Sequence, residues 1–342
     1  MRTEAKLVTK KYGGLFDKIV SLDNLELAYN KASKGKRSRG IVSLIGADLP
    51  FFLTHLQQLL ITGRFTTADY KIKKIFEPKE RLIYILPFYP DRIVHHAIMN
   101  VLEPIFEKWF YDHSLACRKG KGIHSGSRMT AGYVKRFTYC IKGDYSKFYP
   151  SIDHDVMKSI LRHKIKDKRV LALLDDIIDS IPGKTNLPIG NYVSQWLGNL
   201  YLQKFDEFCY EQLHVQHYIR YCDDFVIFSN DKAKLSADMS KLISFAASDL
   251  HMHFSKLQLF KVKQGVDFLG YRHFPDKILL RKSTALRFKR RIRHMHRLAD
   301  LGILDRLYIR GLLASINGWL QHAYTFNFRK YLQLSRLEVF CE

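Results

Sequence analysis

Two acidic residues stand between two β-prone runs of the sequence and could together hold a metal ion. Asp223 and Asp224 follow Cys222, and the runs 217–221 and 225–228 on either side are rich in β-branched and aromatic residues. We therefore expect a β-hairpin with both carboxylates at its tip. A single Asp in a turn would be unremarkable. Two adjacent carboxylates repel each other unless cations compensate their charge.

A third carboxylate follows another apolar run. A strand is expected near residues 137–144, in which the apolar run 137–141 leads to Asp144, at or just beyond the strand end. Mg²⁺ prefers oxygen ligands and usually takes one or two carboxylates plus substrate phosphates. Two such ions can activate an attacking 3′-hydroxyl and stabilise a leaving pyrophosphate. Three carboxylates on neighbouring strand ends therefore favour nucleotidyl transfer.

The charge of the chain points to a polyanionic partner. Its 342 residues carry a formal net charge of +23, with a pI near 9.7. Lys and Arg bound to phosphates release condensed counterions, which favours nucleic acid as the partner. A basic surface that only maintains solubility is the alternative. A membrane-surface protein is disfavoured, because no Lys-rich tail adjoins an apolar anchor.

The five cysteines and the apolar pattern bear on the compartment. The cysteines lie far apart without a C-x-x-C pair, which excludes a zinc ribbon and a disulfide framework. A reducing cytosol is their natural setting. The chain is polar and charged through Lys11, so we expect no signal peptide, and no apolar stretch is long enough to span a membrane. We expect a cytoplasmic protein.

Several elements can be predicted around these residues. Residues 15–60 have helical spacing, runs 71–76 and 81–86 read as strands joined by a turn at 77–80, and a helix is expected from Asp91 through Phe106. The basic loop 117–122 matches neither a P-loop nor a G-x-G-x-x-G motif. A strand is expected near 268–274, followed by helices from about Ser283. No Gly/Pro linker separates these parts, so we expect subdomains of one folded unit.

Six motifs, in order, resemble those of reverse transcriptases, over roughly residues 20–325. Residues 221–224, Tyr-Cys-Asp-Asp, resemble the Y-x-D-D box, and Asp144 stands where the first catalytic motif places its Asp. Residues 187–195 resemble the nucleotide-pocket loop. Residues 81–87 and 91–97 resemble the fingers motifs of bacterial members, and residues 268–272 the primer-grip strand.

The resemblance implies an α+β right-hand polymerase. It places an N-terminal helical extension at 1–60, fingers at 61–135, a palm with a fingers-derived insertion at 136–275, and a helical basic thumb at 276–342. The palm would be an antiparallel sheet that carries the catalytic Asp residues. Asp144, Asp223 and Asp224 would hold two Mg²⁺ ions, with Mn²⁺ as a substitute and the carbonyl of Tyr145 as a further ligand.

The resemblance also assigns residues to the substrates. Lys79 and Arg81 would face the triphosphate, and Tyr149 would exclude a ribose 2′-hydroxyl, unless it is only an aromatic packed beside Phe148. Ile189 and Gly190 would line the nascent base pair, and Gln195 would lie near the template. Lys256 would lie near the pyrophosphate, unless it is an exposed helix-end lysine.

The resemblance assigns the primer grip to Phe268, Leu269, Gly270 and Tyr271. A nucleic-acid-binding helix, or alternatively only a solvated helix face, would carry Arg287, Arg290, Arg291 and Arg297.

The pocket motif indicates a subgroup. Ile-Gly-x-x-x-Ser-Gln, ending at Gln195, resembles reverse transcriptases of diversity-generating retroelements, which copy a template repeat into error-prone cDNA with errors chiefly at template adenines. Phage-defence reverse transcriptases that work with a dedicated noncoding RNA share this motif and are the alternative, and a nonenzymatic RNA-binding protein is a further one. An intron enzyme is disfavoured, because no maturase or endonuclease extension is expected after Glu342. Expected partners are an RNA template, a primer or cDNA, dNTPs, and an accessory protein or second copy of the chain, with no membrane.

Overall fold

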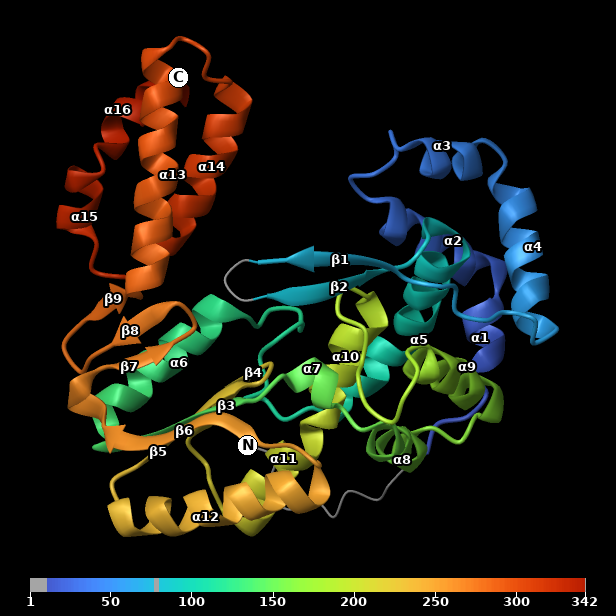
Figure 1. The fold of residues 1–342 in the computed structure, drawn as a ribbon, viewed down its shortest axis with the longest axis horizontal. Coiled ribbons are helices and arrows are strands. Elements are labelled where there is room, and N and C mark those ends of the chain that lie inside the picture. Colours follow the sequence, from blue (N-terminus) through green and yellow to red (C-terminus); the bar gives the residue numbers. More distant parts are fainter. Residues whose placement is uncertain (1–10, 77–79, 342) are drawn as a thin grey trace. The chain divides into compact units, whose positions relative to one another are not determined.

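The computed structural model describes residues 11–76 and 80–341 of the chain (Figure 1). These residues form two compact units, each assembled from three segments. Unit 1 contains the chain up to residue 112 with residues 145–213 and 242–255, and unit 2 contains residues 113–144, 214–241 and 256–342. Lys79 and most of the expected turn at 77–80 lie outside the described residues.

Unit 1 is largely helical. Its elements are α1 (Phe16–Val20), α2 (Leu22–Ser33), α3 (Gly40–Ala47), α4 (Leu49–Ile61), β1 (Lys71–Ile75), β2 (Arg81–Ile85), η1 (Phe88–Arg92), α5 (Ile93–Trp109), α7 (Phe148–Ser151), α8 (His154–Lys164), α9 (Lys168–Asp179), α10 (Tyr192–Tyr201), α11 (Gln203–Glu207) and η2 (Phe208–Gln212). The helical prediction for residues 15–60 is confirmed by α1 to α4. The helix predicted from Asp91 begins slightly later, at Ile93, and ends at Trp109.

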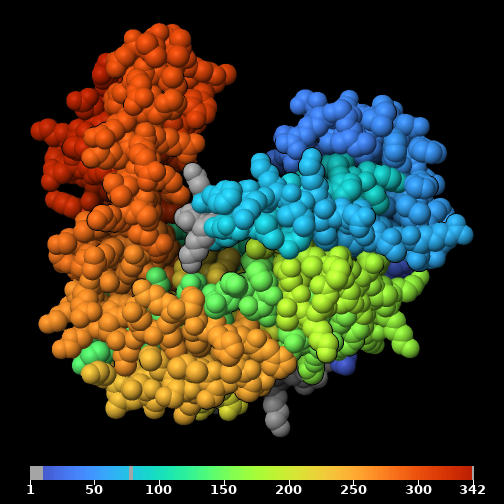
Figure 2. Space-filling view, in the orientation of Figure 1, coloured from blue at the N-terminus to red at the C-terminus, as the bar shows by residue number. Residues whose placement is uncertain are grey.

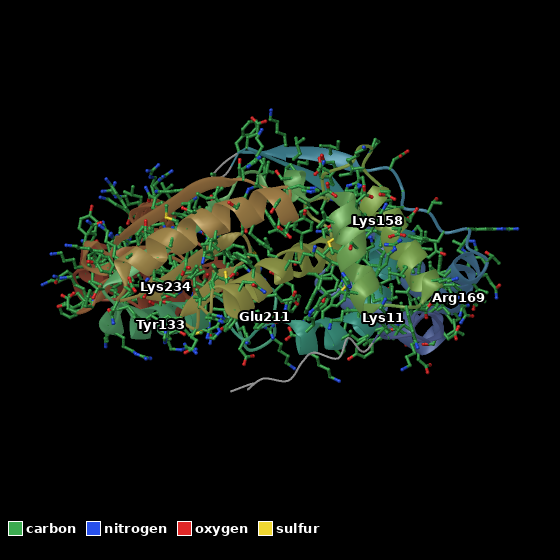
Figure 3. All side chains as sticks on the ribbon, turned by 90° about the horizontal axis from the view of Figure 1, so that it is seen from below. Lys11, Tyr133, Lys158, Arg169, Glu211 and Lys234 are labelled. Atoms are coloured by element: carbon green, nitrogen blue, oxygen red, sulfur yellow. The ribbon has the colours of Figure 1, made fainter. Side chains whose placement is uncertain are left out.

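Side-chain caps fix the starts of several of these helices. Asp153 accepts a hydrogen bond from the backbone N–H of Val156 at the start of α8. Asp167 caps α9 and also accepts from the N–H groups of Leu15 and Phe16, at 2.8 and 3.0 Å. Arg169, labelled in Figure 3, pairs with Asp17 at 2.8 Å and lies 4.1 Å from the ring centroid of Phe16. These contacts fasten α1 to α9.

Strands β1 and β2 form the predicted antiparallel hairpin, in which Ile75 pairs with Arg81. The pocket loop lies beside this hairpin, because the N–H of Tyr84 donates to the carbonyl of Ile189 at 2.8 Å. Helix α5 supplies much of the surrounding core through its buried apolar face. The hairpin therefore connects the N-terminal half of unit 1 to the predicted nucleotide pocket.

Unit 2 is built around a four-stranded sheet of order β4-β5-β3-β6. Its bounds are β3 (Tyr139–Tyr145), β4 (Tyr218–Tyr221), β5 (Asp224–Ser229) and β6 (Phe254–Lys261), with α6 (Ile123–Arg136) and α12 (Lys232–Asp249) as neighbouring helices in the chain. The hairpin expected around residue 223 is confirmed by β4 and β5. The strand expected near residues 137–144 is confirmed by β3. Asp144 is its second-to-last residue, paired with Asp224, rather than a residue just beyond the strand.

A second, three-stranded sheet of order β7-β8-β9 follows. Its strands are β7 (Val266–Phe268), β8 (Tyr271–His273) and β9 (Ile278–Leu280). A single strand at 268–274 was therefore the wrong prediction, because the chain reverses at Leu269 and Gly270, whose φ angles are +55° and +83°. A Cβ on Gly270 would lie 2.6 Å from the Trp319 ring, so glycine permits this close approach.

The helical C-terminal end is confirmed from α13 onward. It contains α13 (Lys282–Asp300), α14 (Arg306–Leu320), α15 (Phe326–Tyr331), α16 (Leu334–Glu338) and η4 (Val339–Cys341). Phe288, Ile292 and Met295 of α13 are buried against Ile309 and Ile316 of α14. The apolar stripe of α13 therefore forms the core of this bundle, and its arginines lie on other faces.

No single helix in the described part of the chain is long and apolar enough to cross a membrane. Helices α3 and α4 reach the length and apolar composition of a membrane span only when taken together, and the two are bent by 94° at the break between them.

Candidate active site

Two of the three predicted catalytic carboxylates stand opposite each other in unit 2. Asp144 of β3 stands directly opposite Asp224 of β5 in the antiparallel register. Side chains opposite each other in such a pair project from the same face of the sheet, with their Cβ atoms about 5 Å apart. Asp223 precedes Asp224 in the turn after β4. The sheet thus brings Asp144 and Asp224 together, with Asp223 next to Asp224 in the chain.

The turn that carries Asp223 has a constrained backbone. Cys222 has a φ angle of +53°, in the left-handed region that non-glycine residues rarely adopt. The fully buried Arg220 donates from Nη1 to the Cys222 carbonyl at 3.2 Å. The backbone of Arg220 also bonds to His113 and Leu115, at 2.9 and 3.0 Å. Arg220 therefore fixes the turn, and its role was not predicted from the sequence.

The electrostatic environment of Asp224 fits a cation site. Burial raises the pKa of the Asp224 carboxyl, Lys142 opposes this rise, and the neighbouring Asp144 adds to it. Two close carboxylates of this kind favour a bound cation, because the ion offsets their repulsion. Carboxylate oxygens are also the hard donors that Mg²⁺ prefers.

The carboxylates do not form a complete ion cage by themselves. Within residues 11–76 and 80–341, no three His, Cys, Asp or Glu side chains gather closely enough to hold a metal ion. Mg²⁺ commonly keeps water and substrate phosphates among its ligands, so a site with one or two carboxylates suits it. The residues present therefore fit a divalent ion that is completed by the substrate.

A lysine joins the catalytic strand to the predicted primer grip. Lys142 precedes Asp144 by two residues and so shares its face of β3. Its Nζ donates to the carbonyl of Asp267 in β7 at 2.6 Å. The carboxylate of Asp267 pairs with Arg281, which directly precedes α13, and the N–H of Arg281 donates to the carbonyl of Gly270 at 2.9 Å. Because alternate residues of a strand share a face, the sequence could have indicated that Lys142 lies on the same face as Asp144.

The predicted primer-grip residues form the turn between β7 and β8. Phe268 and Tyr271 pair with each other and are fully buried, and Leu269 and Gly270 make the turn. The Tyr271 hydroxyl donates to the carbonyl of Trp319 in α14 at 3.0 Å, and their rings stack. The turn is therefore packed against the C-terminal bundle.

The predicted ribose-selecting residue lies in unit 1. Tyr149 is half-buried in α7 and makes an edge-to-face contact with Phe148, with ring centroids 5.2 Å apart. Its carbonyl accepts from the N–H of Leu187 at 2.9 Å. A Cβ on Gly198 of α10 would lie 3.3 Å from the Tyr149 ring and hydroxyl. The fold therefore brings Tyr149 together with the start of the pocket loop.

Gly190 holds the other end of that loop against β2. Its φ angle is +111°, and a Cβ there would lie 2.9 Å from Ile83 Cγ2 and 3.2 Å from the Tyr84 carbonyl. Ile189 is partly exposed beside it. Among the other predicted substrate residues, Arg81 begins β2 and is exposed, and Gln195 is exposed on α10.

The remaining predicted residues lie in unit 2. Lys256 is exposed on β6, the strand that neighbours β3, so the helix-end alternative for it is excluded. All four predicted nucleic-acid-binding arginines, Arg287, Arg290, Arg291 and Arg297, lie on α13. At 100° per residue, Arg290 and Arg297 lie opposite the buried stripe of α13, whereas Arg287 and Arg291 lie beside that stripe on one flank.

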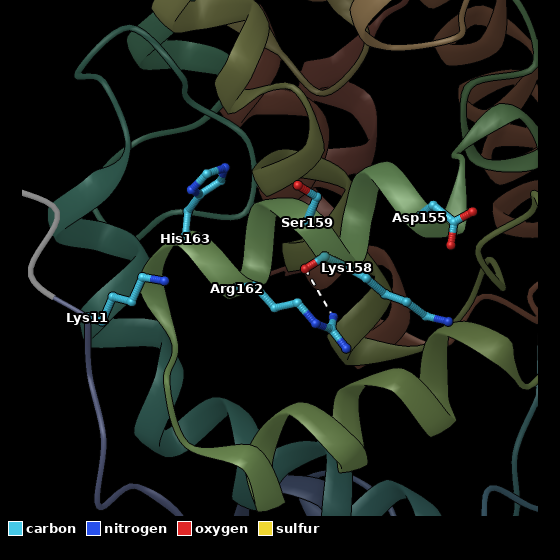
Figure 4. Close-up of a pocket in the computed structure, with 6 residues that line it drawn as sticks. All are labelled: Lys11, Asp155, Lys158, Ser159, Arg162 and His163. Atoms are coloured by element: carbon cyan, nitrogen blue, oxygen red, sulfur yellow. Dashed lines mark hydrogen bonds between the residues drawn. The ribbon is translucent and has the colours of Figure 1, made fainter.

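A separate polar pocket of about 460 Å³ lies in unit 1, lined by Lys11, Asp155, Lys158, Ser159, Arg162 and His163 (Figure 4). Two of its cations already have acidic partners, and Asp155 adds a negative charge to the lining. Arg162 pairs with Asp175 and Lys158 with Asp179, at 2.5 and 2.6 Å. These ion pairs leave little net positive charge for an anionic ligand.

The sequence and this geometry define a family. Residues 72–273 match the family described as reverse transcriptase (RNA-dependent DNA polymerase), and this segment is more than half of the chain. The protein therefore belongs to the reverse transcriptase family, whose members depend on divalent metal ions. The sheet that carries Asp144, Asp223 and Asp224 is its palm.

Individual relatives share moderate similarity. Protein YkfC of Escherichia coli is 24% identical over 295 residues, which cover 70% of this chain and 77% of YkfC. Nuclear intron maturase 1, a mitochondrial protein of Arabidopsis thaliana, is 31% identical over 105 residues, which cover 31% of this chain and only 14% of the maturase. A structure of apo telomerase from Candida tropicalis matches 63% of this chain and 55% of its own, with 12% identity and a TM-score of 0.49.

Proposed function

We propose that the protein copies an RNA template into error-prone cDNA, as the polymerase of a diversity-generating retroelement. The pairing of Asp144 with Asp224, next to Asp223, is the observation that supports the chemistry most strongly. These three side chains, with the carbonyl of Tyr145, would hold two Mg²⁺ ions, for which Mn²⁺ can substitute. When bound, the ions would activate the primer 3′-hydroxyl and neutralise charge on the leaving pyrophosphate.

The protein's own residues prepare the reactants. The Lys142–Asp267 contact holds the primer-grip turn to the catalytic strand, so the primer end is positioned relative to Asp144. Arg81, with Lys79 and Lys256, would bind the triphosphate, where fixed cations oppose the charge that develops during transfer. Tyr149 would occupy the space that a ribose 2′-hydroxyl needs and thereby select dNTPs.

The proposed low fidelity rests on Ile189. Its carbonyl is bonded to β2, so the loop backbone is held while its side chain remains apolar and partly exposed. An apolar side chain can restrict the shape of a nascent base pair but cannot form a hydrogen bond with it. A site that lacks such a bond discriminates less well between similar substrates.

The exchange Ile189→Gln tests this account of fidelity. We expect it to lower misincorporation opposite template adenine several-fold, whereas Ile189→Leu, which keeps the side chain apolar, leaves it unchanged. Sequencing of products from a defined RNA template measures both. If Ile189→Gln copies adenine with the wild-type error rate, the proposed cause of low fidelity is wrong.

Sequencing of the RNA and cDNA that copurify with the protein tests its biological role. A retroelement enzyme should carry cDNA of a repeat with substitutions concentrated at template adenines. Faithful cDNA of one structured noncoding RNA would instead support a phage-defence enzyme.

A further inference from the structure

The segment that follows α14 exposes three aromatic side chains. Tyr324, Phe326 and Tyr331 have exposed fractions of 69%, 72% and 55%. Large aromatic side chains normally contribute to a core, and the core of this bundle is formed by other residues. Exposed rings that recur within residues 324–331 therefore indicate a surface that binds something.

Two cations of α13 lie against one of these rings. Lys289 Nζ is 4.7 Å from the Tyr331 ring centroid, and Arg293 Nη2 donates to the Tyr331 hydroxyl at 3.2 Å. Lys330 is exposed next to Tyr331 in the chain. Residues 282–299 and 321–337 contain no Asp or Glu. Tyr331 thus lies against cations of α13, and Tyr324 and Phe326 are exposed in the same short segment of the chain. Figures 1 and 2 show α13 and α15 at the surface of the C-terminal bundle.

Two of the predicted nucleic-acid-binding arginines, Arg287 and Arg291, lie on a different face of α13 from this surface. Arg287 and Arg291 are four residues apart, as are Lys289 and Arg293, but the two pairs are offset by two residues. That offset rotates them by about 200° around the helix axis. The buried Phe288, and the core with it, lies between the two faces. On the exposed side of α13, Arg290 and Arg297 lie between the two pairs, so substitution of one pair leaves the other pair unchanged.

We propose that Tyr324, Phe326, Tyr331, Lys289, Arg293 and Lys330 form a binding surface for single-stranded nucleic acid, called here the Tyr331 surface. Unpaired bases can stack on exposed rings, and adjacent cations can neutralise the phosphates that link them. A duplex would not use the rings, because its bases are stacked inside. The absence of acidic residues from these two segments matches a polyanion. The surface requires no catalysis and goes beyond the proposed polymerase function.

Binding measurements on the full-length protein test the proposal. The probes are a labelled single-stranded RNA of mixed sequence, about 20 nucleotides long and thus longer than typical single-strand sites, and an RNA–DNA hybrid of equal length. Fluorescence anisotropy without dNTPs or Mg²⁺ gives both affinities. A failure of the polymerase proposal would leave this measurement unaffected.

The triple variant Tyr324→Ala/Phe326→Ala/Tyr331→Ala should bind single-stranded RNA about tenfold or more weakly, because it loses several stacking contacts. Its affinity for the hybrid should stay within about twofold of wild type, since duplex bases do not reach the rings. The matched variant Arg287→Gln/Arg291→Gln should show the reverse pattern. It alters two cations of the same helix on the other face.

The charge variant Lys289→Gln/Arg293→Gln provides a second, independent test. It should weaken single-strand binding and reduce its salt dependence, whereas the aromatic variant should weaken binding with the salt dependence retained. Equal melting temperatures would show that each variant is folded. The proposal is overturned if the wild type does not bind single-stranded RNA, or if the aromatic and charge variants both bind it as the wild type does. It is also overturned if Lys289→Gln/Arg293→Gln and Arg287→Gln/Arg291→Gln each weaken the binding of the single strand and of the hybrid to the same extent.

Discussion

Lys142 donates a hydrogen bond of 2.6 Å from its ammonium group to the backbone carbonyl of Asp267. The bond joins the strand that carries Asp144 to the hairpin whose turn is the predicted primer grip. Asp267 continues the connection through its ion pair with Arg281, at the entrance to α13. Asp267 therefore links the catalytic strand β3, the hairpin of the primer-grip turn and the start of α13.

Replacing Lys142 by Met should slow catalysis more than it weakens nucleotide binding. A hydrogen bond from a charged donor contributes about 1.5–3 kcal/mol, so we expect kcat to fall by about tenfold or more. The KM for dNTP should change little, because the predicted triphosphate residues are untouched. Single-nucleotide incorporation on a preformed primer–template measures both constants.

Lys232→Met, at an exposed lysine that begins α12, is the matched control and should retain wild-type kcat. Lys142→Arg should restore part of the activity, because the guanidinium can still donate to the carbonyl. If Lys142→Met raises KM alone, the positioning role is wrong.

The exchange Tyr149→Val should relax sugar selection. Removal of the ring opens space beside Gly198, so a ribose 2′-hydroxyl can be accommodated. We expect the ratio of kcat/KM for dNTP to that for rNTP to fall by about tenfold or more. Tyr149→Phe keeps the ring and should retain selection. A Tyr149→Val enzyme as selective as the wild type would leave Tyr149 as a packing residue only.

Gly190→Ala should disturb the nucleotide pocket. The φ angle of +111° disfavours an L residue by about 1–2 kcal/mol, and the new Cβ would lie too close to Ile83. We expect a raised KM for dNTP and a lower unfolding free energy. Gly132→Ala in α6, where the added Cβ meets open space, is the control and should preserve both. Unchanged nucleotide affinity in Gly190→Ala would argue against a pocket at this loop.

The buried His273 makes the stability of unit 2 depend on pH. Burial lowers the pKa of His273 to about 4, and its Nε2 lies 2.9 Å from the Ser127 hydroxyl. Because the unfolded chain binds this proton more readily, the stabilisation is complete above pH 6.5 and is lost as the pH falls toward 4. This group alone should lower the unfolding free energy by about 3 kcal/mol over that range.

Urea unfolding of the wild type and of His273→Gln at pH 7 and pH 4 measures this effect. The variant, which lacks the titrating group, should lose less stability on acidification. His294→Gln, at an exposed histidine of α13, should behave as the wild type does. Identical pH dependence in His273→Gln and wild type would contradict the assignment.

Local patterns were sufficient to predict the elements that carry the candidate site. The β4–β5 hairpin and the β1–β2 hairpin are formed by neighbouring residues, so alternation and turn composition indicate them. The start of α13 is likewise marked by a helical apolar stripe. In these segments the residues that determine the structure are close in the sequence.

Relationships between distant segments could not be predicted in this way. The pairing of Asp144 with Asp224 depends on the register between β3 and β5, which no local pattern specifies. The turn at Leu269 was missed because a leucine with positive φ gives no turn signal, and packing against Trp319 stabilises the reversal. The contact of Lys142 with Asp267 joins residues 125 positions apart.

Primer extension on an RNA template with Mg²⁺ and dNTPs tests the central claim most directly. The wild-type protein should synthesise cDNA, and Asp223→Asn should reduce synthesis by about a thousandfold or more, because a charge needed at the metal site is removed. Asp276→Asn, which alters an exposed carboxylate, should extend the primer normally. Synthesis by Asp223→Asn at the wild-type rate would contradict the assignment of the catalytic carboxylates.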